Sequence, residues 1–189
     1  MSIVLAVKKN HEIVVAADSQ TNFGSQVVTF DNHSVSKIRS VADSLLASTG
    51  WSLYDNIFDD FLERNSPKTL ADRKAIFSFF LKLWREMGEK YSLVNEQCNE
   101  DDSPFGDLDA SFLVVNRSGI FHISSDMSVV DFRQYYAIGS GSDYSMGAMH
   151  ALYNQDLDAE TIARRAIEAA IALNVYCGGE TQVHKISFD

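Results

Sequence analysis

"IVLAVKKNHEIVVAAD", residues 3–18, consists of two apolar, β-branched runs on either side of a short polar segment. Such runs indicate strands, and "KKNH" (8–11) predicts a hairpin turn between Ile3–Val7 and Glu12–Asp18. The first run has no basic region before it and is too short for a secretory signal core or a membrane span. We therefore expect a cytoplasmic protein.

Segments that resemble strands and segments that resemble helices occur in separate blocks along the chain. Further strands are predicted at about 27–30, 37–41, 43–50, 110–116, 120–125 and 134–141, and 177–188 is predicted to form a turn and a last strand. The polar segment "DSQTNFGSQ" (18–26) is expected to be a loop. Blocks of strands joined by hairpins and separated from blocks of helices favour an α+β fold with antiparallel sheets. At 189 residues the chain is expected to form one domain, residues 1–189.

Helices are predicted at about 51–65, 70–92, 143–154 and 159–174, because apolar residues recur there at helical spacing. The predicted apolar face of the first comprises Ile57, Phe58, Phe61 and Leu62. That of the second comprises Ile76, Phe77, Phe80, Leu83, Trp84 and Met87, and that of the last comprises Ile162, Ala166, Ala170 and Leu173. Aromatic residues at this spacing are expected to pack in the core.

Composition and charge argue against several classes of protein. A net charge of −10 and a pI near 4.8 argue against nucleic-acid binding and against binding to an anionic membrane. The two cysteines, Cys98 and Cys177, have no metal-ligand spacing, and the five histidines form no HExxH motif. The "GSGSDYSMG" segment (139–147) lacks the third glycine of a dinucleotide site. We therefore expect neither a cofactor nor a metal.

An acidic segment, "NEQCNEDDSPFGDLD" (95–109), loosely resembles a calcium-binding loop. Counted from Asp101, however, the twelfth position is Phe112, where such a loop needs a bidentate glutamate. The segment is therefore expected to be a solvated loop.

Ser2 is a candidate nucleophile, because aminopeptidases remove Met1 when a small residue follows it. The α-amino group then exposed has a pKa of about 8 and can act as the general base for the hydroxyl of the same residue. Such a site also needs a cation, a carboxylate that holds it and a backbone N–H for the oxyanion. Lys37, Asp18 and Gly50 are candidates for these three roles. From these residues alone, the alternative that Ser2 is an inert N-terminal serine stays open.

Several segments together, in chain order, resemble the β-type subunits of the proteasome superfamily. They are "SIVLAVKKNHEIVVAADSQTNFG" (2–24), "SKIRSV" (36–41), "LLASTG" (45–50), "AIGSGSDYSMGAMHALY" (137–153) and "IEAAIALNVYCGGETQVHKI" (167–186). Within the superfamily they are most similar to bacterial HslV-like peptidases and bacterial proteasome homologues. The resemblance implies an N-terminal nucleophile (Ntn) hydrolase with two antiparallel sheets between two helical layers, a four-layer αββα sandwich.

The resemblance also implies roles for particular residues. Ser2 takes the position of the nucleophile, Lys37 that of the catalytic lysine, and Gly50 that of the oxyanion-binding glycine. Asp18 ends the second strand, where it is expected to hold the lysine, and Ser140 takes the position of a supporting serine.

Two further positions are expected to bind substrate, and three depart from the family pattern. Asn22 lies near the position that binds the substrate backbone, and Ser48 lies near the floor of the specificity pocket. The nucleophile is serine rather than threonine. Asn174 and Cys177 stand where many members have aspartate and serine. Asn174 is expected to accept a hydrogen bond from the Ser2 amine, whereas a thiol is a weak partner.

The function implied is that of an Ntn endopeptidase subunit that hydrolyses polypeptides inside a chamber of stacked rings, of about six or seven subunits each. An ATP-dependent unfoldase is the implied partner. Two alternatives stay open: a ring or scaffold subunit without catalytic activity, and an Ntn amidase that acts on small molecules.

Overall fold

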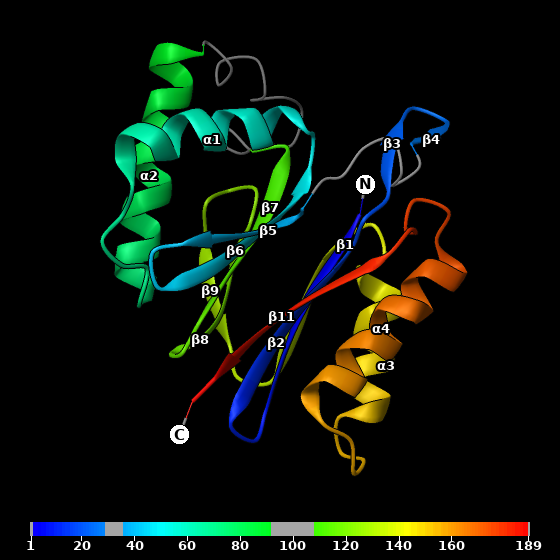
Figure 1. The fold of residues 1–189 in the computed structure, drawn as a ribbon. Coiled ribbons are helices and arrows are strands. Elements are labelled where there is room, and N and C mark those ends of the chain that lie inside the picture. Colours follow the sequence, from blue (N-terminus) through cyan, green and yellow to red (C-terminus); the bar gives the residue numbers. More distant parts are fainter. Residues whose placement is uncertain (1, 29–35, 92–107, 189) are drawn as a thin grey trace.

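The apolar hairpin at the start of the chain forms the centre of a four-stranded antiparallel sheet (Figure 1). The computed structural model describes residues 2–28, 36–91 and 108–188. Strand β1 (Ile3–Lys9) pairs with β2 (Glu12–Asp18) through a turn in which Asn10 has a φ of 55°. The turn predicted at 8–11 is therefore too long, because Lys8 and Lys9 belong to β1 and pair with β2. Strand β10 (Tyr135–Gly139) flanks β1, and β11 (Thr181–Ser187) flanks β2.

A second antiparallel sheet contains five strands in chain order. They are β5 (Ile38–Val41), β6 (Ser44–Gly50), β7 (Ala110–Asn116), β8 (Gly119–Ile123) and β9 (Val129–Phe132). A separate hairpin is formed by β3 (Thr21–Phe23) and β4 (Gln26–Val28).

The predicted loop at 18–26 is therefore wrong in part, since it contains β3, and β9 was not predicted at all. Most of the predicted acidic loop at 95–109, including Asp101, lies outside the described residues, as does the end of the strand predicted at 27–30.

Helices cover the outer faces of both sheets. Helices α1 (Leu53–Asn65) and α2 (Arg73–Lys90) pack on the five-stranded sheet, and α3 (Ser142–Leu152) and α4 (Ala159–Leu173) pack on the four-stranded sheet (Figure 1). Successive side chains of β1 point to opposite faces. Leu5 packs toward α3 and α4, whereas Val4 packs between the two sheets. The expected α+β, four-layer sandwich is confirmed, and burial on both faces explains why β1 is apolar throughout.

Two predicted core residues are exposed. Phe77 is 45% exposed, and Phe79 is buried in its place. Phe79 lies three residues after the buried Ile76 and shares its face, whereas Phe77 is rotated from that face by about 100°. Leu173 is 63% exposed at the end of α4, whereas Cys177 in the following turn is buried in the same core cluster as Ala170.

Across the described ranges, none of the helices is both long enough and apolar enough to cross a bilayer. The same ranges contain no group of three or more histidine, cysteine or acidic side chains arranged to hold a metal ion.

Candidate active site

Ser2 is held at the start of β1 by contacts on both sides. It is 6% exposed, and its carbonyl oxygen accepts hydrogen bonds from the Gly141 N–H (3.4 Å) and the Ser140 hydroxyl (3.4 Å). Gly139 has a φ of +100°, and a Cβ at this position would lie 2.2 Å from the Ser2 carbonyl oxygen. Only glycine tolerates both the conformation and the approach. A chain end would otherwise fray, and these contacts hold Ser2 in a defined position.

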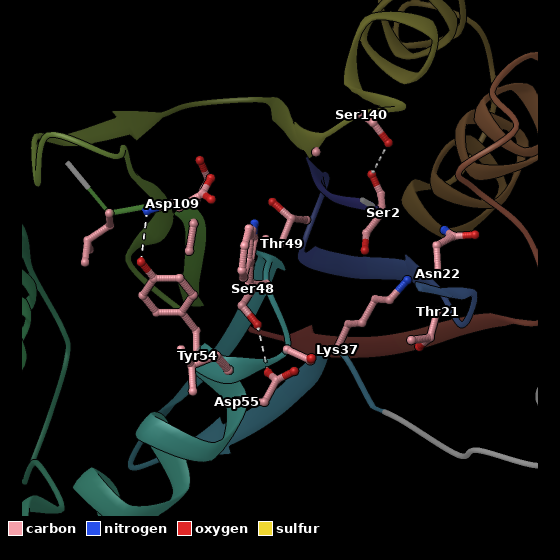
Figure 2. Close-up of a pocket in the computed structure, with 18 of the residues that line it drawn as sticks. Ser2, Thr21, Asn22, Lys37, Ser48, Thr49, Tyr54, Asp55, Asp109 and Ser140 are labelled. Carbon is pink, nitrogen blue, oxygen red and sulfur yellow. Dashed lines mark hydrogen bonds between the residues drawn. The ribbon is translucent and has the colours of Figure 1, made fainter. Parts of the chain in front are cut away.

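Asp18 and Lys37 form a buried ion pair beside Ser2. Nζ of Lys37 lies 2.6 Å from Oδ1 of Asp18 and also donates to the Gln20 carbonyl oxygen at 2.8 Å. The Asp18 carboxylate further accepts the N–H groups of Ile3 and Gly178, both at 3.0 Å. Burial lowers the pKa of Lys37, and the Asp18 carboxylate opposes that shift. Figure 2 shows the Ser2 side chain pointing toward the Lys37 ammonium.

A pocket of about 800 Å³ opens in front of Ser2 and Lys37 (Figure 2). Gly50, at the end of β6, lines it with a φ of +135°, and a Cβ there would lie 2.6 Å from the Asp109 carbonyl oxygen. Six of the nine predicted site residues line this pocket: Ser2, Asn22, Lys37, Ser48, Gly50 and Ser140. The other three, Asp18, Asn174 and Cys177, lie behind Ser2, Lys37 and Ser140 and contact them or their neighbours.

Comparison with known proteins assigns the family. Residues 101–186 match the family described as proteasome subunit. The ATP-dependent protease subunit HslV of Campylobacter concisus is 30% identical over 178 residues, which cover 92% of this chain and 90% of that protein. The chain belongs to the HslV-like proteasome family.

Other relatives of this proteasome-type chain agree over its whole length. HslV of Pseudothermotoga lettingae is 29% identical over 189 residues, which cover 97% of this chain and 96% of that protein. The structure of Thiobacillus denitrificans BPH in complex with epoxomicin has a TM-score of 0.89 at 30% identity and covers 99% of both chains. The expected resemblance is confirmed, and the chain is a proteasome-type peptidase subunit.

In this HslV-like subunit the two residues expected to bind substrate face the pocket from opposite sides. The Asn22 amide accepts a hydrogen bond from Gln20 (3.0 Å) and donates one to the Tyr176 carbonyl oxygen (3.3 Å). These bonds join β3 to the turn after α4. The Ser48 hydroxyl donates to Oδ1 of Asp55 at 3.5 Å, which ties β6 to the first turn of α1.

The side chain of Asn174 bonds to the backbone of Ser140 and Tyr176. Its Nδ2 donates to the Ser140 carbonyl oxygen at 2.5 Å, and its Oδ1 accepts the Tyr176 N–H at 2.9 Å. In this structure Asn174 therefore acts on Ser2 through Ser140, and the hydrogen bond expected from the Ser2 amine to Asn174 stays a prediction.

Cys177 is 4% exposed, with its sulfur 4.0 Å from the Ser140 hydroxyl. Burial raises the pKa of the thiol to about 11. The sulfur is therefore uncharged at neutral pH and serves as a weakly polar packing group behind Ser140.

Sequence reasoning missed several residues of the pocket wall. Trp51, Tyr54 and Asp55 lie in the segment that follows Gly50, and Asp109 precedes β7. The helix prediction marked the buried face of 51–65 and assigned no role to its remaining residues. The signal that could have identified the residues after Gly50 was their closeness in sequence to this predicted oxyanion-binding glycine.

Proposed function

We propose that this chain is an endopeptidase subunit in which Ser2, after removal of Met1, is the nucleophile that hydrolyses peptide bonds. One observation carries the proposal: Ser2, Lys37 and Gly50 line a single pocket, and Asp18 holds the lysine from behind. These are the nucleophile, the cation and the backbone donor that N-terminal nucleophile chemistry requires.

In the proposed reaction, Oγ of Ser2 attacks the carbonyl carbon of the scissile bond, and its proton passes to the free Ser2 amine. The positive charge of Lys37 favours the neutral form of that amine, so that it can accept the proton. The Gly50 N–H donates to the oxyanion of the tetrahedral intermediate. The amine then gives its proton to the leaving nitrogen, and the amine product departs. Water attacks the remaining ester by the same route, which releases the acid and restores Ser2.

We also propose that the subunit assembles into stacked rings of about six or seven copies, works in the cytoplasm and receives unfolded polypeptides from an ATP-dependent unfoldase. The relatives' name, ATP-dependent protease subunit, supports an ATPase partner. Large apolar side chains exposed near the pocket support contacts between subunits: Phe23, Val27, Leu173 and Val175 are each at least 56% exposed.

The test compares wild type and Ser2→Ala for hydrolysis of fluorogenic peptides, together with N-terminal sequencing of the purified assembly. We expect a chain that begins at Ser2 and hydrolysis by wild type only. Hydrolysis that survives in Ser2→Ala would overturn the nucleophile assignment. Retention of Met1 without hydrolysis would instead favour the inactive scaffold. Hydrolysis of small acylated amines but not of peptides would favour the amidase.

A further inference from the structure

The wall of the pocket carries two carboxylates that the proposed reaction does not use. Asp55 lies in the first turn of α1 and Asp109 lies just before β7, and both line the pocket. Figure 2 shows Asp55 next to Ser48 and Asp109 on the side of the pocket away from Lys37. Among the described lining residues Lys37 is the one with a cationic side chain, and its charge is paired with Asp18. The pocket therefore has an excess of negative charge.

Asp55 is only partly neutralised by the protein. Its side chain is 29% exposed. Oδ1 lies 3.0 Å from Nη1 of Arg39 and accepts a hydrogen bond from the Ser48 hydroxyl at 3.5 Å. The same Arg39 guanidinium is shared with Asp59, whose carboxylate lies 3.4 Å from Nε. One arginine thus faces two carboxylates, and the Asp109 carboxylate adds to the negative charge. Arg39 itself does not line the pocket, so a cation from the substrate can approach Asp55 from the open side.

The remainder of the wall suits the stem of a long side chain. Trp51 is 68% exposed and Leu53 is 43% exposed, and both line the pocket. The Tyr54 hydroxyl accepts the Asp109 N–H at 2.9 Å, which fastens the Asp109 backbone to α1. Lysine and arginine bury their methylene stems on apolar surface while the charged group stays polar, and a guanidinium also stacks on indole. Ser48 is small and leaves the Asp55 carboxylate within reach.

We propose that this pocket takes an arginine or lysine side chain of the substrate, so that the subunit cleaves after basic residues, with Asp55 as the main specificity-determining residue. The inference rests on the proposed function, because it assumes that the residue bound here is the one whose carbonyl Ser2 attacks.

The experiment uses two fluorogenic peptides that differ only by arginine or citrulline before the scissile bond, since citrulline keeps the shape but lacks the charge. For wild type we expect kcat/KM to be about tenfold higher for the arginine peptide, as for a partly buried charged hydrogen bond. In Asp55→Asn the ratio should fall close to one. Asp59→Asn is the matched control, because Asp59 is the other carboxylate that Arg39 contacts but it does not line the pocket. This variant should keep the wild-type ratio.

Three outcomes would overturn the inference. One is an equal rate on both peptides in wild type. Another is a ratio that Asp59→Asn lowers as much as Asp55→Asn does. The third is a loss in Asp55→Asn that is equal for both peptides, since Asp55 would then act through Lys37 rather than on the substrate.

A binding measurement separates this inference from the proposed function. Ser2→Ala cannot use the proposed chemistry but keeps the pocket, so fluorescence anisotropy can compare its Kd for labelled arginine and citrulline peptides. We expect the arginine peptide to bind about tenfold more tightly, and this preference to be lost in Ser2→Ala with Asp55→Asn. If no peptide is hydrolysed by wild type, the proposed function fails and this Kd ratio decides the inference alone. Equal Kd values would overturn it.

Discussion

The ammonium nitrogen of Lys37 lies 2.6 Å from Oδ1 of Asp18, with side-chain exposures of 8% and 0%. Asp18 ends β2, and Lys37 directly precedes β5, so the pair links the two sheets at the edge where Ser2 directly precedes β1. The Asp18 carboxylate also accepts the Ile3 N–H, which connects the ion pair to the residue next to Ser2. The same ion pair therefore supports both the packing of the sheets and the proposed nucleophile.

Lys37→Met should abolish peptide hydrolysis and lower the free energy of unfolding by about 3 kcal/mol, because it leaves the buried Asp18 carboxylate without a counter-ion. Urea denaturation at a fixed protein concentration measures the loss. The control is Lys37→Met combined with Asp18→Asn, which removes both charges but keeps an oxygen acceptor beside the Ile3 and Gly178 N–H groups, and it should recover part of the stability but no activity. If Lys37→Met alone were as stable as wild type, the ion pair would not stabilise the fold.

Gly139→Ala should displace Ser2 and lower kcat/KM for a peptide by about 100-fold, as a misplacement of about 1 Å can. The reason is the 2.2 Å approach that the added Cβ would make to the Ser2 carbonyl oxygen. Gly147→Ala is the matched control, because a Cβ at this position in α3 meets nothing within 4 Å. That variant should keep full activity and gain about 0.5–1 kcal/mol of stability. Equal activities of the two variants would contradict the argument.

Cys177 should make the fold less stable as the pH rises above 9. Burial raises the pKa of its thiol to about 11, from an ordinary value of about 9, so between these values the folded state holds a proton that the unfolded state has lost. The contribution of the Cys177 thiol to the free energy of unfolding is then fully present below pH 9 and is lost as the pH rises toward 11. Between pH 8 and pH 10 the loss is about 1 kcal/mol. Urea denaturation of wild type and Cys177→Ser measures it, and a serine variant with the same pH dependence would refute the assignment.

The local part of the site was predictable from the sequence, and the long-range part required the family resemblance. The hairpin prediction places the two strands side by side, and the register observed in the structure, which pairs Val4 with Ala17, brings Asp18 beside the start of β1. No local pattern brings Lys37 or Ser140 to the same place, since their approach depends on how the sheets pack. The strands β3 and β9 were missed because three or four residues are too few to show a period of two.

Asp55 illustrates why the pocket wall was not predicted. A helical pattern identifies the residues that face the core, and all polar residues on the other faces look alike in sequence. Asp55 differs from its neighbour Asp59 only because the start of α1 lies against Ser48, so that one carboxylate lines the pocket while the other does not. That difference arises from the position of α1 on the five-stranded sheet.

Asn174→Asp would introduce the residue that many family members carry, yet we expect it to reduce activity in this chain. The Asn174 Nδ2 donates to the Ser140 carbonyl oxygen at 2.5 Å, and a carboxylate would instead set two acceptors against each other. The repulsion should shift Ser140, whose hydroxyl contacts the Ser2 carbonyl oxygen. We expect kcat/KM for a peptide to fall about tenfold, the cost of one charged, unsatisfied contact of about 1.4 kcal/mol.

The control for this change is Asn154→Asp, which adds the same charge at an exposed position in the turn after α3 and should leave kcat/KM unchanged. Steady-state hydrolysis of one fluorogenic peptide by wild type and both variants measures the effect. A rise in activity in Asn174→Asp would mean that the residue acts on the Ser2 amine, because a carboxylate near that amine would stabilise the ammonium that forms when the amine takes the proton of the nucleophile. A fall confined to Asn174→Asp would instead support the contact with Ser140, because only that contact needs an amide donor at this position.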